Sequence, residues 1–242
     1  MIKKILLLLL VMFVSAGYAD NSANQSLTVV LDWFINPDHA PLLVAEQQGF
    51  FQRAGLKVKL IQPADPMDGP KWVAVKKADV AVTYQPQLLM QIDQGLPLVR
   101  FGSLVDSPLD CLVTLKSSHI QHIEDLKGQS IGYSSGGIDS AMLQVMLQNH
   151  GLSLNQVTFI NVRYDLVQAL LSGHIGAFTG AMRNVEPIQL AQLGHPPQVF
   201  YPEENAFPAY EELIFVANQS RSHDPRLAKF FMGNATSRSI FD

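Results

Sequence analysis

The chain has 242 residues, 48% of them hydrophobic, and its 17 lysines and arginines against 21 aspartates and glutamates give a net charge of −4. The basic residues are scattered, so the sequence offers no basic stripe for nucleic acid or for an anionic membrane surface. The one cysteine, Cys111, excludes an internal disulfide, and its apolar neighbours favour a small core residue over a nucleophile.

Residues 1–19 have the order of a secretory signal peptide. Lys3 and Lys4 precede an apolar run from Ile5 to Val14, and small residues end the segment at Ala19. The run is about half the ~20 residues that a membrane-spanning helix needs, and no nearby cysteine could take a lipid. We expect cleavage after Ala19 and a free protein in the periplasm.

The next part of the chain alternates between strand and helix patterns. Strands are predicted at 27–31, 56–60, 79–83 and 97–104, and helices at 39–48, 71–75 and 86–94. Residues 56–60 alternate apolar and charged side chains, which predicts an edge strand with one wet face. Strands that alternate with helices favour a mostly parallel sheet covered on both faces.

A second series with the same pattern follows. Strands are predicted at 111–115, 130–133, 157–162 and 175–179, with helices at 138–149 and 165–171, and then a strand at 210–217 and a helix after Pro225. The fold class is therefore α/β, with two α/β lobes around a cleft and a hinge. We expect lobe 1 over 20–106, lobe 2 over 107–205, and a return to lobe 1 over 206–242.

Several side chains are candidates for ligand binding in the cleft. Trp33 ends a strand and could stack on a planar ligand, and Asn36 and His39 follow it in a loop. Tyr84 follows the strand at 79–83, where ligand sites of open α/β sheets gather. Trp33 could equally be a core residue, His39 a locally bonded one and Tyr84 a buried structural tyrosine.

Polar residues of the second lobe are candidates for the same cleft. The turn Ser135-Gly136-Gly137, between a strand and a helix, could aim backbone N–H groups at an anion, or could simply need glycine for its backbone angles. Asn184 and Glu186 follow the strand at 175–179. A carboxylate there could accept two hydrogen bonds from an aminopyrimidine edge, although both residues could instead lie on a surface helix.

Enzymatic chemistry has little support in the sequence. It has no G-x-S-x-G elbow, no H-E-x-x-H pair, no clustered Cys/His ligands and no complete P-loop or dinucleotide fingerprint. We therefore expect no catalytic residues, no metal and no cofactor.

A series of motifs then carries a family resemblance. Residues 31–41, Leu-Asp-Trp-Phe-Ile-Asn-Pro-Asp-His-Ala-Pro, look like the opening of the NMT1/THI5-like family, and the likeness continues through 45–51, 77–80, 125–133 and 173–177. The family includes ABC-transporter binding proteins for thiamine pyrimidine precursors and a pyrimidine synthase. The resemblance implies the type II periplasmic-binding-protein fold.

The resemblance also assigns a ligand, a partner and site residues. It implies a small-molecule ligand of the hydroxymethylpyrimidine or formylaminopyrimidine type, an ABC permease in the inner membrane and a monomer. Trp33 and Tyr84 would be aromatic walls with His39 beside them, the turn at 135–137 a polar or phosphate-side contact, and Glu186 the pyrimidine-edge acceptor. A sulfonate or another small solute is the alternative ligand.

The chain departs from the family in two respects. The synthase uses a lysine and a histidine where this chain has Thr83 and Gln87, and it carries a cysteine-rich run where this chain has residues 206–210, so pyridoxal-phosphate chemistry is not expected. Family members also continue through several more helices, so we expect the return to lobe 1 over 206–242 to be truncated.

Overall fold

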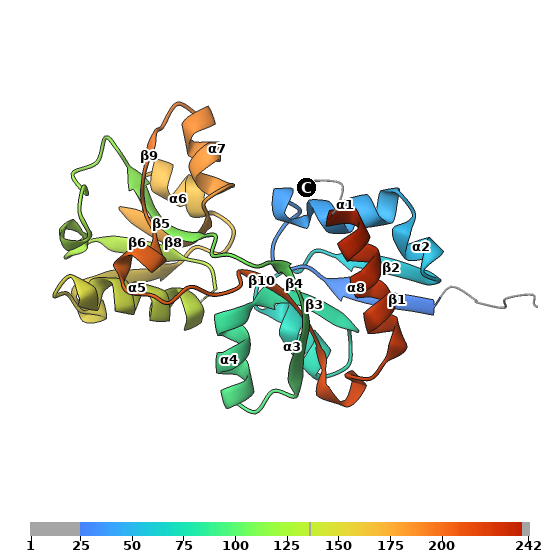
Figure 1. The fold of residues 1–242 in the computed structure, drawn as a ribbon. Coiled ribbons are helices and arrows are strands. Elements are labelled where there is room, and N and C mark those ends of the chain that lie inside the picture. The colour runs from blue at the N-terminus through green and yellow to red at the C-terminus, as the bar shows by residue number, and fades with distance from the viewer. Residues whose placement is uncertain (1–24, 136, 239–242) are drawn as a thin grey trace, which may run out of the picture.

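The computed structural model describes residues 25–135 and 137–238, and these fold into two lobes that lie side by side (Figure 1). The predicted signal peptide and Gly136 lie outside the described residues. Each lobe is built on one five-stranded sheet, and the chain passes between the lobes twice. Within the described residues, no helix is long and apolar enough to span a membrane.

The sheet of lobe 1 has the strand order β2-β1-β3-β10-β4, and β10 runs antiparallel to both of its neighbours. The two edges are therefore β2 and β4, which confirms the edge position predicted for residues 56–60. The strands are β1 (Gln25–Val30), β2 (Leu56–Ile61), β3 (Val80–Tyr84), β4 (Leu98–Val105) and β10 (Leu213–Asn218).

Helices cover both faces of this sheet, as the alternating sequence pattern predicts. Side chains of β3 alternate between two apolar clusters, with Val80 and Val82 on one face and Ala81 on the other. On the first face Phe51 stacks on Phe230, with ring centroids 5.3 Å apart. The α-helices are α1 (Ala40–Gln47), α2 (Phe50–Arg53), α3 (Asp68–Ala74), α4 (Gln85–Asp93) and α8 (Pro225–Arg238), with 3-10 turns η2 (Pro37–His39) and η6 (Gln219–Arg221).

The sheet of lobe 2 has the order β7-β6-β8-β5-β9, and here β5 is the strand that runs antiparallel to its neighbours. Cys111 on β5 is fully buried in an apolar cluster, as expected of a core residue. The elements are β5 (Asp110–Leu115), η3 (Ile123–Leu126), β6 (Ser130–Tyr133), α5 (Gly137–Asn149), η4 (Leu154–Gln156), β7 (Thr158–Asn161), α6 (Leu166–Leu171), β8 (Ala177–Met182), α7 (Glu186–Gln192), β9 (Pro197–Phe200) and η5 (Pro202–Asn205).

Three features of lobe 2 differ from the sequence prediction. Strand β8 ends at Met182 rather than at 179, the helix α7 was expected only as the alternative placement of Glu186, and β9 was not predicted. Gly180, which has φ +84°, marks the end of the predicted strand, but β5 pairs with β8 on both sides of it. Both α7 and β9 are short and contain proline, so packing on β5 and β8 defines them more than their own sequence does.

Two connecting segments form the hinge between the lobes. Residues 106–109 lead from β4 to β5, and residues 201–212 lead from β9 to β10. The carboxylate of Glu212 accepts hydrogen bonds from the backbone N–H groups of Leu109 at 2.6 Å and Asp110 at 2.9 Å, so it ties the two segments together.

Candidate functional site

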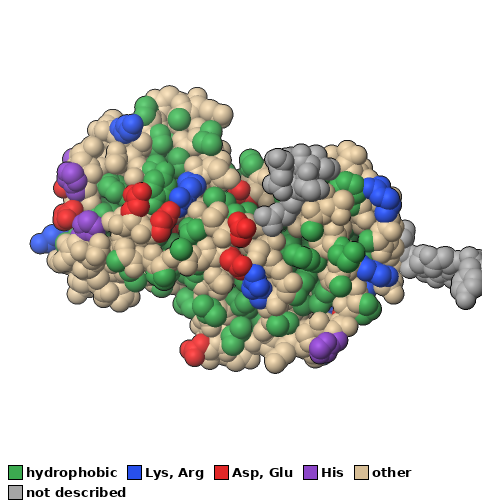
Figure 2. Space-filling model, viewed as in Figure 1, with side chains coloured by type: hydrophobic (Ala, Val, Ile, Leu, Met, Phe, Trp, Pro, Cys, Tyr) green, Lys and Arg blue, Asp and Glu red, His purple; other side chains and the backbone are tan. Residues whose placement is uncertain are grey.

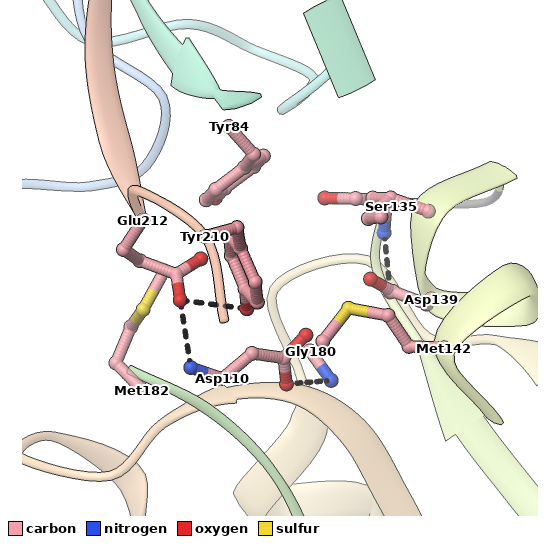
Figure 3. Close-up of a pocket in the computed structure, with 10 residues that line it drawn as sticks. Tyr84, Asp110, Ser135, Asp139, Met142, Gly180, Met182, Tyr210 and Glu212 are labelled. Carbon is pink, nitrogen blue, oxygen red and sulfur yellow. Dashed lines mark hydrogen bonds between the residues drawn. The ribbon is translucent and has the colours of Figure 1, made fainter. Parts of the chain in front are cut away.

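A cavity lies between the lobes, next to the hinge, and its walls come from both lobes and from the connecting segment 201–212 (Figure 3). In this arrangement of the lobes the cavity is small, with a volume of about 10 Å³, which is room for about one water molecule. It is lined by Tyr84, Asp110, Ser135, Ile138, Asp139, Met142, Gly180, Met182, Tyr210 and Glu212.

Three of these residues, Asp110, Asp139 and Glu212, are buried carboxyls held by backbone N–H groups. The Asp110 carboxylate accepts from Gly180 N at 3.1 Å, and Glu212 accepts from the hinge amides. The Asp139 carboxylate accepts from the backbone N–H groups of Ser134 at 2.9 Å and Ser135 at 2.8 Å. Each carboxyl is therefore fixed in position by the chain around it.

Burial raises the pKa of all three carboxyls. The pKa of Asp139 is raised to about 6 and that of Glu212 to about 7 because burial disfavours their charged forms. The pKa of Asp110 is raised well above its usual value by burial and by the neighbouring carboxyls Asp139 and Glu212. The three carboxyls therefore keep their protons to a higher pH than exposed carboxyls do.

The cavity contains no positive charge to balance these carboxyls. No lysine or arginine is among the residues that line it. Arg183 and Arg100 lie outside the cavity and pair with Glu203 at 2.7 Å and with Glu211 at 2.6 Å. On the face shown in Figure 2, acidic side chains lie near the band where the lobes join, with basic side chains beside them. The site therefore favours a ligand that carries N–H donors or positive charge, and disfavours an anion.

Two tyrosines form an aromatic side of the cavity, and Figure 3 shows them facing Asp110, Ser135 and Met142. Tyr84 lies at the end of β3 and donates a hydrogen bond to Asp32 at 3.0 Å. Tyr210 lies in the second connecting segment and donates to Glu212 at 2.8 Å. Their rings give the cavity flat apolar surface beside its carboxyls.

Of the predicted site residues, Tyr84 and Ser135 line the cavity, and His39 lies behind it. His39 is fully buried, its Nε2 is 2.9 Å from Asp32 Oδ1, and its Nδ1 accepts from Asn36 N at 3.3 Å. With Nδ1 accepting from Asn36, Nε2 is the ring nitrogen that donates to Asp32. Asp32 in turn accepts a hydrogen bond from the Tyr84 hydroxyl, so His39 positions Tyr84 through the Asp32 carboxylate.

Trp33 is not among the residues that line the cavity. It packs against lobe 2, where its ring meets the edge of Tyr164 with centroids 4.6 Å apart, and it is 5% exposed. Tyr164 also donates a hydrogen bond to the backbone oxygen of Pro63 at 3.0 Å. Trp33 therefore packs between the lobes. Its buried surroundings match the alternative, left open by the sequence, that it is a core residue.

Asn36, Asn184 and Glu186 also lie outside the cavity wall. Asn36 accepts from the backbone N–H of Asp38 and caps η2. Asn184 donates to Asp38 at 2.6 Å, a hydrogen bond between the lobes. Glu186 accepts from Met182 N at 2.8 Å at the start of α7, and burial raises its pKa to about 7. In this structure its carboxyl stabilises a strand-to-helix turn.

In the described part of the glycine-rich turn, two backbone N–H groups already have a partner within the protein. They are the N–H groups of Ser134 and Ser135, which are bonded to Asp139. Gly137 allows a close approach between the lobes, since a Cβ there would lie 3.0 Å from Met90 Cε on α4. The charge of Asp139 already compensates this end of α5.

Sequence reasoning missed the three carboxyls together with Tyr210 and Gly180. The sequence carried a signal for two of these residues, Asp110 and Glu212. Asp110 is the first residue of β5 and Glu212 directly precedes β10, and these two strands are the ones that enter a lobe from the hinge. Asp139 gave no such signal, because an acidic residue in the first turn of a helix is common. In the part of the chain that the structure describes, no three His, Cys, Asp or Glu side chains are arranged to hold a metal ion.

Comparison with known proteins places this site in context. The family described as NMT1/THI5 like matches residues 36–241. A Haemophilus influenzae protein provisionally named as a thiamine biosynthesis protein is 45% identical over 86% of this chain and 66% of its own length. A formylaminopyrimidine-binding protein of Halalkalibacterium halodurans is 30% identical over 90% of this chain and 67% of its own length.

The family also contains enzymes. A 4-amino-5-hydroxymethyl-2-methylpyrimidine phosphate synthase of Legionella pneumophila is 35% identical over 72% of this chain and 55% of its own length. The chain thus spans about two thirds of the two relatives above and about half of this synthase.

Solved structures confirm the predicted fold class. The alkanesulfonate-binding protein SsuA of Xanthomonas axonopodis pv. citri, bound to MOPS, aligns with a TM-score of 0.71 at 16% identity, over 91% of this chain and 74% of that one. At that identity the likeness concerns the two-lobed α/β fold alone.

Proposed function

Because this chain belongs to the NMT1/THI5-like family, we propose that it is the solute-binding component of an ABC importer and binds a thiamine-precursor aminopyrimidine. The ligand would be of the hydroxymethylpyrimidine or formylaminopyrimidine type. A cleaved signal peptide over residues 1–19 would deliver the protein to the periplasm, where it would act as a monomer and pass the ligand to a permease in the inner membrane.

The observation that carries the proposal is the cation-free cavity with three carboxyls and two tyrosines. An aminopyrimidine presents an amino group beside a ring nitrogen that can be protonated, and a carboxylate accepts two parallel hydrogen bonds from such an edge. Tyr84 and Tyr210 offer surface for the flat ring. We propose that Tyr84 and Ser135 contact the ligand. We also propose that Asp110, in place of Glu186, accepts the hydrogen bonds of the pyrimidine edge.

A sulfonate is a poorer fit to the same cavity. Its negative charge would lie beside Asp110, Asp139 and Glu212 with no lysine or arginine in the wall. Like charges in a buried site repel strongly, and a desolvated anion needs donors that this wall has already committed to its own carboxylates. The electrostatics therefore support an aminopyrimidine rather than a sulfonate as the proposed ligand.

An enzyme of pyrimidine synthesis is the second candidate, favoured by relatives such as the Legionella pneumophila synthase. The resemblance places the lysine and histidine of the synthase at Thr83 and Gln87, which are 1% and 2% exposed. Neither side chain can form a Schiff base with a pyridoxal aldehyde. We therefore propose a binding protein without catalytic activity, and expect no absorbance band of bound pyridoxal phosphate after reconstitution.

Calorimetric titration tests the ligand class. We expect hydroxymethylpyrimidine and formylaminopyrimidine to bind with micromolar or tighter dissociation constants, on the order of −8 kcal/mol, and taurine and alkanesulfonates to give no heat. Sulfonate binding without pyrimidine binding would overturn the assignment.

The role of the carboxyl wall is tested by Asp110→Asn, which keeps the shape of the side chain. Loss of a charge-assisted hydrogen bond should weaken aminopyrimidine binding at least about tenfold. Asp93→Asn, at the exposed end of α4, is the matched control and should leave the affinity unchanged. Equal affinities for the two variants would remove Asp110 from the proposed site.

A further inference from the structure

The segment that returns the chain from lobe 2 to lobe 1, residues 201–212, is held at both of its ends. At the lobe 1 end, the Glu211 carboxylate accepts hydrogen bonds from Nε and Nη2 of Arg100 on β4, each at 2.6 Å. At the lobe 2 end, the segment begins with η5, which packs on α5. A motion of one lobe against the other is therefore taken up between these two anchors.

The backbone between the anchors bends sharply at Ala206. This residue directly follows η5 and has φ +72°, a left-handed conformation that a residue with a Cβ adopts only where its neighbours impose it. Its neighbour Asn205 is 9% exposed, and the Asn205 Nδ2 donates a hydrogen bond to the backbone oxygen of Tyr201 at 2.8 Å. The conformation of Ala206 thus depends on how firmly η5 is held.

The residue that holds η5 to lobe 2 is His150, which directly follows α5. Its Nε2 lies 2.7 Å from Asn205 Oδ1, and its Nδ1 lies 2.9 Å from Glu124 Oε1 in η3. Both partners are acceptors, because a carboxylate has no donor and the Asn205 Nδ2 is already bonded to Tyr201. A neutral imidazole carries one N–H and satisfies one of these acceptors, whereas an imidazolium donates to both.

The charges around this end of α5 favour the imidazolium. The hydrogen bonds to Glu124 and then to Asn205 raise the pKa of His150. The other titratable groups on η3, η5 and α4, and the one directly before η3, are exposed; they are His122, Asp125, Glu203, Glu204 and Asp93. The elements η4 and β8 also pack on α5 and carry no titratable side chain. Glu124 is therefore the charged group that contacts the ring.

From this geometry we propose that His150 is a pH-sensitive latch of the hinge. When protonated it ties η5, and with it the start of the connecting segment, to lobe 2. Loss of the proton removes one of its two hydrogen bonds and makes the other a neutral one, about half as strong. Because the pKa is raised, the latch is complete at low pH and loosens as pH rises through that pKa.

The inference goes beyond the proposed function, because it concerns the motion of the lobes and not the identity of the ligand. Loosening of η5 lets the bend at Ala206 relax, so the movable part of the segment lengthens toward lobe 2. Tyr210 and Glu212 of the same segment line the cavity, so the mobility of the cavity wall follows the charge of His150.

An NMR titration of the ligand-free protein between pH 5 and pH 8.5 tests the latch. We expect the His150 ring to titrate at a higher pH than the exposed ring of His223, and the backbone amides of residues 205–207 to shift with the same midpoint. His150→Gln can still donate to Asn205 but cannot titrate, so this transition should vanish from the amides. His223→Gln is the matched control and should keep it.

Hydrogen exchange measures the loosening itself. The backbone N–H of Phe207 donates to the oxygen of Pro202 at 3.0 Å, so it reports whether η5 keeps its shape. Its protection, corrected for the intrinsic effect of pH on exchange, should fall about threefold to tenfold from pH 5.5 to pH 8, and should stay level in His150→Gln.

A second variant keeps the test decisive if His150→Gln folds poorly. Glu124→Gln, at an exposed position, preserves the size of the side chain and should lower the His150 midpoint toward that of His223. Two results would overturn the latch. One is an unaltered amide transition at 205–207 in His150→Gln, which would assign it to the buried carboxyls. The other is a His150 ring that titrates like His223 while the protection of Phe207 stays constant with pH.

Discussion

At the scale of single residues, the cavity depends on how closely the chain approaches its buried carboxyls. Gly180 has φ +84°, and a Cβ there would lie 2.7 Å from Asp139 Oδ2, the oxygen that receives the Ser134 and Ser135 amides. The backbone N–H of Gly180 also reaches Asp110 at 3.1 Å. Glycine is thus required twice at this position, for its backbone angle and for the space that the Asp139 carboxylate fills.

Gly180→Ala should therefore destabilise the protein by about 2 to 4 kcal/mol and weaken ligand binding. Gly95→Ala separates the two causes, because Gly95 has φ +88° with nothing within 4 Å of its added Cβ. It should cost only the backbone strain, about 1 kcal/mol, and leave affinity unchanged. Urea unfolding of both variants gives the comparison, and equal losses would show that Asp139 does not constrain position 180.

At the scale of elements, a few side-chain contacts between loops of the two lobes hold the lobes together. Asn184 donates to Asp38 at 2.6 Å, and Tyr164 contacts both Trp33 and Pro63. These residues belong to loops at strand ends, so they can separate without disrupting either sheet. Several residues expected to touch the ligand thus act in this structure as contacts between the lobes.

Removal of one such contact should shift the lobes toward a more open arrangement. Asn184→Ala deletes the hydrogen bond to Asp38, and we expect a larger radius of gyration in small-angle X-ray scattering of the free protein. Apparent ligand affinity should fall about threefold to tenfold, because the closed form becomes less populated. Asn149→Ala, at the exposed end of α5, should change neither quantity. An unchanged scattering profile for Asn184→Ala would argue against this contact as a determinant of closure.

At the scale of the whole molecule, buried carboxyls with raised pKa values link stability to pH. The pKa values of Asp139, Glu186 and Glu212 are raised to about 6, 7 and 7. A carboxyl whose pKa is raised on folding binds more protons in the folded state than in the unfolded state. It therefore stabilises the protein fully below its unfolded pKa near 4, and this contribution is lost as pH rises through the folded pKa.

We expect the free energy of unfolding of the ligand-free protein to fall between pH 5 and pH 8. Glu212 alone would account for roughly 3 kcal/mol, at about 1.4 kcal/mol per pKa unit. Urea denaturation at four pH values measures the slope, and Glu212→Gln, which cannot titrate, should make it shallower. A stability that rises from pH 5 to pH 8 would contradict the raised pKa values.

The sequence by itself determined the α/β class and most of the elements, because the spacing of apolar residues and the glycine and proline positions are local properties of the chain. It also located Tyr84 and Ser135, since the ends of strands are visible as changes of pattern. The tertiary structure alone decided the carboxyl wall, because Asp110, Asp139 and Glu212 lie far apart in the chain and meet only when two strands cross between the lobes. For the same reason the burial that raises their pKa values could not be found in the sequence, since burial is a property of the packed lobes and not of any segment.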